Sequence, residues 1–391
     1  MIRMGVVGHG GRVSSVIKEC LRPEMPDLRV VAIVDPDRAG ATGRLAEQDR
    51  GDVVFYDSLS EMVKGARLDA LAIGTRCHMH TPYAIEAAGY DLPLYLEKPV
   101  SINMEQANAL ERAFEHSRCN VLVSFPLRVS LLCEMARQHI VAGAIGTPDH
   151  VMAVNYVPYG TVYFDDQYRN FTITQGLWVQ KATHDLDYLM YLMDSPIVRV
   201  AAMATWGHIF GGNKPAGLVC SACPEAETCL ESPDNRKHNL SGGTLRDHPC
   251  VFGSDIGTPQ TGMNEDSSSA VLEFASGAHG AYTQVFYSRR DAGMRGATVS
   301  GYHGTVGFDW YKNELHLVRH HVPLSDVSHG DAGASHFGGD TELARDFAAM
   351  VHKGKTPRAG IRQGLQSIYA CLAAKESAER GVMINVQQVR I

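Results

Sequence analysis

The chain has 391 residues, of which 45% are hydrophobic and 20% charged, and its formal net charge is −7. This length favours two domains, and the composition is that of an ordinary globular protein. No run of lysine or arginine offers the concentrated basic face that nucleic-acid binding requires, and no apolar stretch reaches the roughly 18 residues of a membrane span. The first residues already read as a strand, which leaves no room for a signal peptide. We therefore expect a cytoplasmic protein that binds neither nucleic acid nor membrane.

Short β-branched runs alternate with helical patterns over residues 1–125. The predicted strands are Ile2–Val7, Val30–Val34, Val53–Tyr56, Ala70–Ile73, Leu94–Glu97 and Val121–Ser124. Helical patterns between them include Val13–Cys20, Tyr83–Ala88 and Met104–His116. This alternation predicts an α/β fold with a doubly wound parallel sheet, which we assign to residues 1–125 as the first domain.

From about Val151 the strands become longer and alternate between apolar and polar residues, as in VMAVNYV, SSAVLEFASGAHGAYTQVFY and ELHLVRHHV. This pattern predicts an α+β domain over residues 126–391 with a large, mainly antiparallel open sheet. Helical patterns lie at Gln180–Met193, Thr341–Lys353 and Arg362–Arg380. Residues 211–262 are rich in Gly, Pro, Ser, Asp and Cys without periodicity, which indicates a long insertion.

The stretch VVGHGGRV carries glycines at the end of the first predicted strand and before a helix. One glycine permits a tight turn, another lets the backbone approach a pyrophosphate, and the helix start supplies N–H groups. Asp35 ends the next predicted strand, where an acid binds the adenosine ribose hydroxyls. No arginine directly follows it, which favours NAD, although Arg38 keeps NADP open and an unliganded turn is the alternative. The residues assigned here to the cofactor are Gly8, His9, Gly10, Gly11, Arg12, Asp35 and Val13, the last standing at the usual third glycine position.

Two further segments, GTRCHMHTPYAIEAAG and LYLEKPVSINMEQA, resemble the Gfo/Idh/MocA family, named for glucose–fructose oxidoreductase and inositol dehydrogenase. The stretch VSFPLR, ending at Arg128, resembles the strand and linker at the family's domain junction. Residues from His336 onward resemble its C-terminal helices. The resemblance implies a Rossmann domain, NAD and an oxidoreductase activity. The residues that match the family pattern are Thr75, His80, Ala84, Glu97, Lys98 and Pro99, and we assign Thr75, His80, Glu97 and Lys98 to the cofactor site.

The resemblance also implies a role for Lys98 in the reaction. In the family this lysine lies beside the nicotinamide, and the following proline often has a cis peptide bond. A positive charge there would stabilise an alkoxide as it develops. The alternative is an exposed ion pair at a strand end, which would contribute little stability.

The stretch GLWVQKATHDLDYLMYL supplies the other catalytic candidates. On one continuous helix, Gln180, Lys181 and His184 would share a face. A histidine whose pKa is near neutrality can take a proton from a sugar hydroxyl while hydride leaves its carbon. The family usually has Asp where this chain has Gln180. The proton acceptor is therefore open between His184 alone and a pair of Lys181 and Lys98 in which burial neutralises one lysine.

We expect an NAD-dependent oxidoreductase that acts on a secondary hydroxyl of a sugar, cyclitol or sugar derivative. The alternative is a glycosidase or lyase that oxidises the sugar transiently and then eliminates; a third is a binding protein that kept the fold. Family resemblance implies a homodimer or homotetramer associated through the outer face of the antiparallel sheet. The candidate substrate-binding residues are Arg128, Tyr156, Tyr159, Trp178 and Gln180.

The insertion contains four of the nine cysteines in a C-x2-C-x5-C pattern followed by one more. Four thiolates would satisfy tetrahedral zinc or an iron–sulfur cluster, with His238 and His248 nearby in sequence. A metal here would be structural, and incidental thiols in a loop are the alternative. The candidate ligands are Cys220, Cys223, Cys229 and Cys250.

Overall fold

The computed structural model describes residues 1–330 and 335–391, and the chain divides into two compact units. The first contains Met1–Leu131, Asp331–Tyr369 and Gln388–Ile391, and the second contains Leu132–Gly330 and Ala370–Gln387. The first unit thus takes its residues from both ends of the chain. None of the helices in the described part of the chain combines the length and the apolarity that a membrane span requires.

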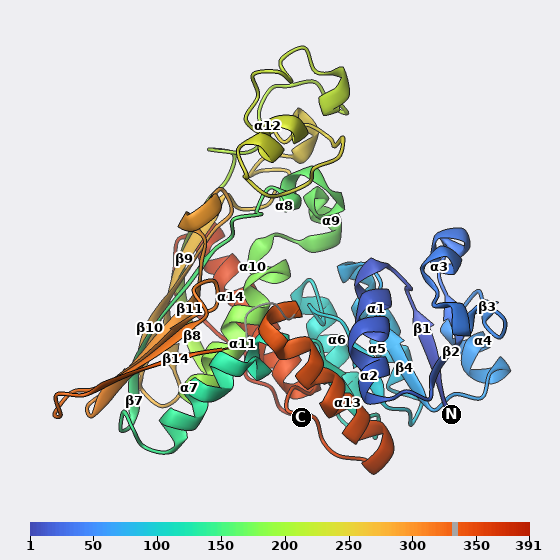
Figure 1. Ribbon diagram of the computed structural model, residues 1–391, viewed down its shortest axis with the longest axis horizontal. Coiled ribbons are helices and arrows are strands. Elements are labelled where there is room, and N and C mark those ends of the chain that lie inside the picture. The colour runs from blue at the N-terminus through green and yellow to red at the C-terminus, as the bar shows by residue number, and fades with distance from the viewer. Residues whose placement is uncertain (331–334) are drawn as a thin grey trace. The chain divides into compact units, whose positions relative to one another are not determined.

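A six-stranded sheet forms the centre of the first unit (Figure 1). Its strands are β1 (Ile2–Val7), β2 (Leu28–Val34), β3 (Val54–Tyr56), β4 (Ala70–Ile73), β5 (Leu94–Leu96) and β6 (Val121–Val123). All pair in parallel in the order β3-β2-β1-β4-β5-β6, which confirms the predicted doubly wound sheet. The order reverses between β1 and β4, and ligands of such sheets bind at the carboxyl ends of the strands beside this point.

Short helices connect these strands, and polar side chains cap three of them. They are α1 (Gly11–Ser15), α2 (Arg22–Glu24), α3 (Arg38–Arg44), α4 (Leu59–Gly65), α5 (Cys77–Ala87) and α6 (Met104–Phe114), and a π-helical turn joins α1 to α2. The side chains of Asp37, Ser58 and Asn103 accept a hydrogen bond from the first turn of α3, α4 and α6. Such caps satisfy backbone donors that a helix start leaves without a partner.

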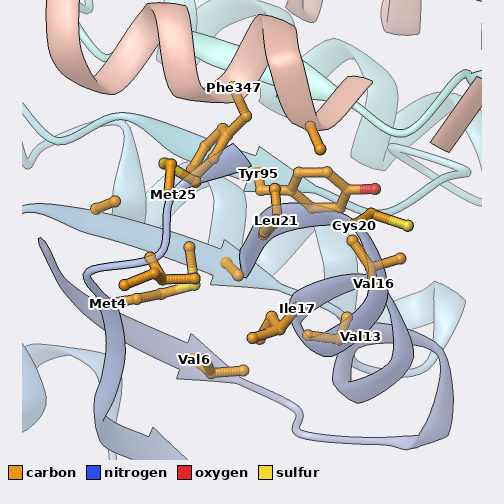
Figure 2. Packing of buried hydrophobic residues seen from close by; sticks show 14 of the residues in the cluster. Met4, Val6, Val13, Val16, Ile17, Cys20, Leu21, Met25, Tyr95 and Phe347 are labelled. Carbon is orange, nitrogen blue, oxygen red and sulfur yellow. The ribbon is translucent and has the colours of Figure 1, made fainter. Parts of the chain in front are cut away.

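The helix α13 (Gly339–Lys353) completes the hydrophobic core of the first unit. Figure 2 shows Phe347 of this helix beside Tyr95 of β5, with Met4 and Met25 nearby. The two rings meet edge to face, with centroids 5.8 Å apart and an interplanar angle of 84°. Because Phe347 is fully buried by residues of the N-terminal sheet, this late segment belongs to the same core as β1.

A nine-stranded sheet forms the second unit. Its strands are β7 (Pro148–Tyr156), β8 (Ile197–Thr205), β9 (Ser267–Phe274), β10 (His279–Val285), β11 (Met294–Gly301), β12 (Gly304–Asp309), β13 (Glu314–Arg319), β14 (Ser325–His329) and β15 (Ile384–Asn385). The pairing is antiparallel except between β7 and β10, which confirms the mainly antiparallel sheet. Along β7, Val151, Ala153 and Asn155 are buried while Met152 is 55% exposed, so one face is covered and the other is open.

The helix α11 (Ala182–Met193) lies against the covered face of this sheet (Figure 1). The remaining helices that begin in or reach this unit are α7 (Leu131–Val141), α8 (Val162–Asp165), α9 (Phe171–Thr174), α10 (Leu177–Gln180), α12 (Pro233–His238) and α14 (Ile361–Arg380), and α14 contributes residues to both units. The predicted continuous helix over Gln180–Met193 is wrong. The backbone breaks at Lys181, where φ is −110° and ψ is −49°, so α10 and α11 are separate helices.

The insertion at residues 211–262 is anchored to the rest of the second unit by a small hydrophobic cluster. Val251 and Ile256 are buried against Phe164 and Phe286 of the surrounding unit. Arg236 of α12 is fully buried, and its Nη1 lies 2.5 Å from Asp165 Oδ2. Apolar burial and a buried ion pair therefore hold this segment.

Candidate active site

The glycine turn after β1 has the shape that a dinucleotide site requires. Gly8 has a φ of +79°, and a Cβ there would lie 2.7 Å from the Thr75 backbone, so only glycine fits. A Cβ on Gly10 or Gly11 would instead meet no atom of the described residues within 4 Å. The backbone that opens α1 therefore borders empty space, and its N–H groups suit a pyrophosphate.

Val13 stands where the usual fingerprint has its third glycine, which serves close packing of helix on strand. In this chain the space comes from Gly74, directly after β4. A Cβ on Gly74 would lie only 1.9 Å from Val13 Cγ2. The larger side chain at position 13 is thus accommodated by a glycine that directly follows the neighbouring strand.

Asp35 is fixed in the turn that follows β2. Its Oδ2 accepts a hydrogen bond from the His9 backbone N–H at 2.8 Å, and its Oδ1 accepts one from Asp37 N–H at 2.9 Å. His9 is 2% exposed, and burial lowers the pKa of its imidazole. Asp35 is half-buried, and each carboxylate oxygen retains a lone pair for a ribose hydroxyl. His9 therefore acts through its backbone N–H, which fixes the Asp35 carboxylate in this turn.

Arg12 forms a charge network at the same edge of the sheet. Its guanidinium binds Asp340 through two hydrogen bonds of 2.9 and 2.6 Å, and its Nε lies 3.1 Å from Glu97 Oε1. Glu97 also accepts a hydrogen bond from the Ser124 hydroxyl at 3.1 Å. Burial opposes ionisation of Asp340, but hydrogen bonds from Arg12 and His336 hold its pKa well below the usual range. Arg12 and Glu97 therefore fix the carboxyl end of β5.

His80 holds the loop after β4 against the segment after β5. Its Nδ1 lies 2.8 Å from the Pro99 carbonyl oxygen, and its Nε2 lies 3.0 Å from the Thr75 carbonyl oxygen. The ring is 2% exposed, and burial lowers its pKa. The Lys98–Pro99 peptide bond is cis, and Lys98 is half-buried. His80 is therefore a positioning residue that sets where the Lys98 backbone lies.

Arg128 belongs to the first unit and is only 7% exposed. Its Nη1 donates to the Arg358 carbonyl oxygen at 2.8 Å. The structure thus directs this guanidinium toward the segment that precedes α14.

In the second unit, the break between α10 and α11 places Gln180, Lys181 and His184 differently from the single helix face predicted for them. Gln180 ends α10, while His184 lies in the first turn of α11. Both side chains are 5% exposed, as is Lys181 between them. Lys181 Nζ donates a hydrogen bond to the Tyr159 hydroxyl at 3.0 Å. Its pKa is lowered by burial, which the Tyr159 oxygen partly offsets.

A second buried ion pair joins Asp185 of α11 to Arg295 of β11, and it was not predicted from the sequence. Asp185 Oδ1 accepts two hydrogen bonds from Arg295, at 3.0 and 2.8 Å. Its Oδ2 accepts hydrogen bonds from Asn155 at 2.8 Å and from the Tyr282 hydroxyl at 2.9 Å. Arg295 is 3% exposed on an inward position of β11. The sequence signal that could have indicated this pair is a charged residue at an inward position of an alternating strand.

Glu265 was also missed, and it holds the start of α10. Its Oε2 accepts a hydrogen bond from Leu177 N–H at 2.5 Å. The side chain is 2% exposed, and burial raises its pKa to about 7. A carboxylate at a helix start offsets the partial positive charge of the backbone N–H groups.

Of the candidate substrate residues, Tyr156 faces away from this arrangement and Trp178 is buried beside it. Asn155 points to α11, and because successive strand side chains point to opposite faces, Tyr156 belongs to the open face of the sheet. Trp178 is fully buried, with its ring centroid 6.1 Å from that of Tyr282. The structure does not bring these two side chains to the surface where Tyr159 lies.

The cysteines of the insertion do not form the metal site suggested by their number. Cys220 Sγ lies 3.6 Å from His248 Nε2, and burial raises the pKa of this thiol to about 11. Cys223 and Cys229 are half-exposed, whereas Cys250 is buried. Within residues 1–330 and 335–391, no group of three or more His, Cys, Asp or Glu side chains is arranged to hold a metal ion. The residues present therefore do not fit zinc or an iron–sulfur cluster.

Comparison with known families agrees with this architecture. Residues 2–125 match the family model described as the oxidoreductase family with an NAD-binding Rossmann fold. Residues 133–307 match the GFO/IDH/MocA C-terminal domain. The chain belongs to the GFO/IDH/MocA oxidoreductase family.

Curated dehydrogenases are among the proteins similar to this chain. Inositol 2-dehydrogenase of Serratia proteamaculans is 25% identical over 51% of this chain and 56% of its own length. Myo-inositol 2-dehydrogenase of Thermotoga maritima is 20% identical over 99% of both chains. For five of the curated relatives, the match spans only 56–64% of the relative's length.

Solved structures of low sequence identity share the fold of the whole chain. Levoglucosan dehydrogenase, determined in complex with NADH and levoglucosan, superposes with a TM-score of 0.75 at 17% identity. The superposition covers 99% of this chain and 100% of that chain. At this identity the likeness establishes the fold.

Proposed function

We propose that this chain is an NAD-dependent dehydrogenase that transfers hydride between nicotinamide and a secondary hydroxyl of a sugar, cyclitol or sugar derivative. The observation that carries the proposal is the open glycine turn, where Gly8 is required by the backbone and Gly10 and Gly11 border empty space. NAD, when bound, supplies the hydride-accepting nicotinamide. The chain's own residues would bind it, hold the substrate and move the proton.

NAD fits the acidic end of β2 better than NADP does. Asp35 presents a carboxylate to a ribose hydroxyl, and this charge would repel a 2′-phosphate. Arg38, the arginine that could accept such a phosphate, forms an ion pair with Asp57 and lies 5.9 Å over the Phe55 ring. The cofactor-binding residues in this proposal are Gly8, His9, Gly10, Gly11, Arg12, Val13, Asp35, Thr75, His80, Glu97 and Lys98.

We assign Lys98, Lys181 and His184 to the reaction. Lys98 would place a positive charge where the substrate oxygen becomes an alkoxide, which lowers the energy of the transition state. Lys181 and His184 are titratable groups on the second unit, and Gln180 would contact the substrate beside them. Relatives named inositol and levoglucosan dehydrogenases support a polyhydroxylated ring as the substrate class.

The first experiment compares two substitutions of the same kind in the first unit. Gly11→Asp puts a negative charge at the start of α1, and Gly43→Asp puts one on exposed α3, where a Cβ likewise meets no described atom within 4 Å. An aspartate in a first helical turn stabilises the helix, so Gly11→Asp is expected to fold. We expect Gly11→Asp to weaken NAD binding at least about tenfold, measured by calorimetry, and Gly43→Asp to leave it unchanged.

The second experiment measures turnover of a panel of cyclitols, sugars and glycosides with NAD. Formation of NADH in proportion to substrate consumed supports the dehydrogenase. Cleavage of a glycoside without net NADH would instead assign the chain to the glycosidase or lyase class. Failure of the wild-type chain to bind NAD would refute both readings.

We also propose that the chain forms a homodimer or homotetramer through the open face of the second sheet. Met152, Met203, Val271 and Val318 are between 43% and 81% exposed on this face. Clustered apolar side chains of this kind mark association surfaces. Native mass spectrometry tests the proposal, and a purely monomeric species would refute it.

A further inference from the structure

Tyr159 lies on the turn after β7, where its phenol oxygen accepts a hydrogen bond from a buried ammonium group. The side chain of Tyr159 is 37% exposed, whereas Lys181 is 5% exposed. Lys181 Nζ is 3.0 Å from the Tyr159 oxygen and 5.2 Å from the centroid of its ring. The break between α10 and α11 is the backbone feature that places Lys181 here.

Positive charge exceeds negative charge around this pair. Asp185 is the carboxylate of the cluster, and Arg295 already binds it through two hydrogen bonds. Lys181 donates to a neutral phenol, and its Nζ also lies 5.7 Å from the centroid of the Tyr163 ring. The titratable and charged groups that act on Tyr159 from the elements around it are Lys181, Arg295, Asp185, Tyr163 and Tyr311.

This surplus favours loss of the phenol proton. The Lys181 charge, opposed by burial and assisted by Arg295, lowers the pKa of Tyr159 to about 8. Burial also lowers the pKa of Lys181, so both members of the pair titrate closer to neutrality than they do in water. A general base is most effective when its pKa lies near the working pH.

We propose that Tyr159, held and polarised by Lys181, is the group that exchanges the proton with the substrate hydroxyl. Of the residues considered for this role in the second unit, Lys181 and His184 are each 5% exposed, so Tyr159 is the most exposed of the three. The proposal rests on the proposed dehydrogenase function. In it, Lys181 does not exchange the proton itself but is a positioning residue for Tyr159.

The proton and electron balance of the step is complete with the proposed cofactor. In the oxidation direction, the substrate O–H bond breaks and its proton moves to the Tyr159 phenolate. The adjacent C–H bond breaks, its electron pair leaves as hydride to oxidised nicotinamide, and a C=O bond forms. The alcohol is oxidised and NAD is reduced, and Tyr159 then returns its proton to solvent, since the Lys181 ammonium has no lone pair to accept it.

Titration of the phenol in the free protein tests the pair without cofactor or substrate. Tyrosinate absorbs in the near ultraviolet, so difference spectra of wild type against Tyr159→Phe report the ionisation of this one residue. We expect a step with an apparent pKa of about 8 that is lost in Tyr159→Phe. The control is Tyr287→Phe, which removes a hydroxyl from a tyrosine of similar exposure, 40%, and is expected to keep the step. In Lys181→Met, the step should move upward toward about 10, the value of an unperturbed tyrosine.

Turnover gives the second readout. We expect Tyr159→Phe to lower kcat at least about 100-fold, with unchanged NAD affinity, and to lose the alkaline dependence of kcat on pH. Persistence of the low step in Tyr159→Phe, or turnover of this variant with the wild-type pH profile, would overturn the inference and leave the dehydrogenase intact. Absence of hydride transfer in the wild-type chain would overturn the proposed function and the inference together.

Discussion

Each unit contains a network of charged side chains, but carboxylates outnumber cations in the first network and cations outnumber carboxylates in the second. Around Arg12 in the first unit, one guanidinium serves two carboxylates, Glu97 and Asp340. Around Asp185 in the second unit, one carboxylate lies with two cations, Arg295 and Lys181. The first network holds the pKa of Asp340 low, whereas the second lowers the pKa of Tyr159.

The difference shows two uses of the same interaction. In the first unit the charges lock the end of a strand, since Arg12 joins Glu97, directly after β5, to Asp340 of α13 through three hydrogen bonds. In the second unit the cationic surplus makes a proton easier to release. The two networks of this chain therefore differ in the sign of the charge that is in excess.

The largest expected effect comes from removing the single carboxylate of the second network. Asp185→Ala would leave Arg295 buried without its anion, and we expect a loss of about 3–5 kcal/mol in the free energy of unfolding. Asp340→Ala in the first network should cost clearly less, because Arg12 keeps Glu97 and its side chain is 34% exposed. Urea unfolding of both variants measures this, and equal losses would contradict the contrast drawn between the networks.

The next effect tests whether backbone space, rather than charge, shapes the glycine turn. Gly8→Ala forces a side chain into a positive φ and within 2.7 Å of the Thr75 backbone. We expect about 2–4 kcal/mol of destabilisation in urea unfolding. Gly10→Ala, at an extended φ of −75° with open space around it, should change stability by less than about 1 kcal/mol. A tolerated alanine at position 8 would show that the turn can adopt another shape.

Glu265 supplies a prediction about pH. Its pKa is about 7 in the folded chain and 4.5 ordinarily, so the folded state binds its proton more tightly. Its contribution to stability is therefore full below about pH 4.5, declines as the pH rises to about 7, and is then constant. At about 1.4 kcal/mol per pH unit, the full decline is about 3–4 kcal/mol.

The variant Glu265→Gln should remove this decline because it has no carboxyl proton to lose. Urea unfolding at about pH 5 and about pH 8 measures the difference. Glu273→Gln, the same change at a partly exposed site on β9, is the control and should retain the wild-type slope. A wild-type slope in Glu265→Gln would assign the decline to another group.

The smallest effect concerns the insertion. Cys223 and Cys229 are half-exposed, while Arg236 and the apolar residues around Val251 hold the segment. We expect the double variant Cys223→Ser/Cys229→Ser to change the free energy of unfolding by less than about 1 kcal/mol. A chelator should leave wild-type unfolding unchanged. Stoichiometric zinc in elemental analysis, lost with the chelator, would argue against the account given for this segment.

Some features were readable because they depend on neighbours in sequence. The strand β2 reads LRVVAIV, an apolar run that a parallel sheet buried on both faces requires. The need for glycine at position 8 is likewise a property of one backbone turn. The motif around Lys98 was identified by family resemblance, which places it at a strand end without stating its contacts.

Other features were not readable because they depend on distant partners. The helix over Gln180–Met193 had no proline or glycine to mark its break, and the break at Lys181 accompanies contacts with Tyr159 and Tyr163. The metal prediction failed for a related reason. Cysteine spacing gives the number of possible ligands, whereas their arrangement depends on how the insertion packs.

By itself, the sequence determined the doubly wound sheet, the position of the glycine turn after its first strand and the antiparallel character of the later strands, since hydrophobic period and glycine placement are local. Only the tertiary structure decided the charge networks. Arg12 meets Asp340 across 328 residues and Arg295 meets Asp185 across 110. Burial and charge proximity set a pKa, and both arise from neighbours that folding, rather than sequence order, brings into contact.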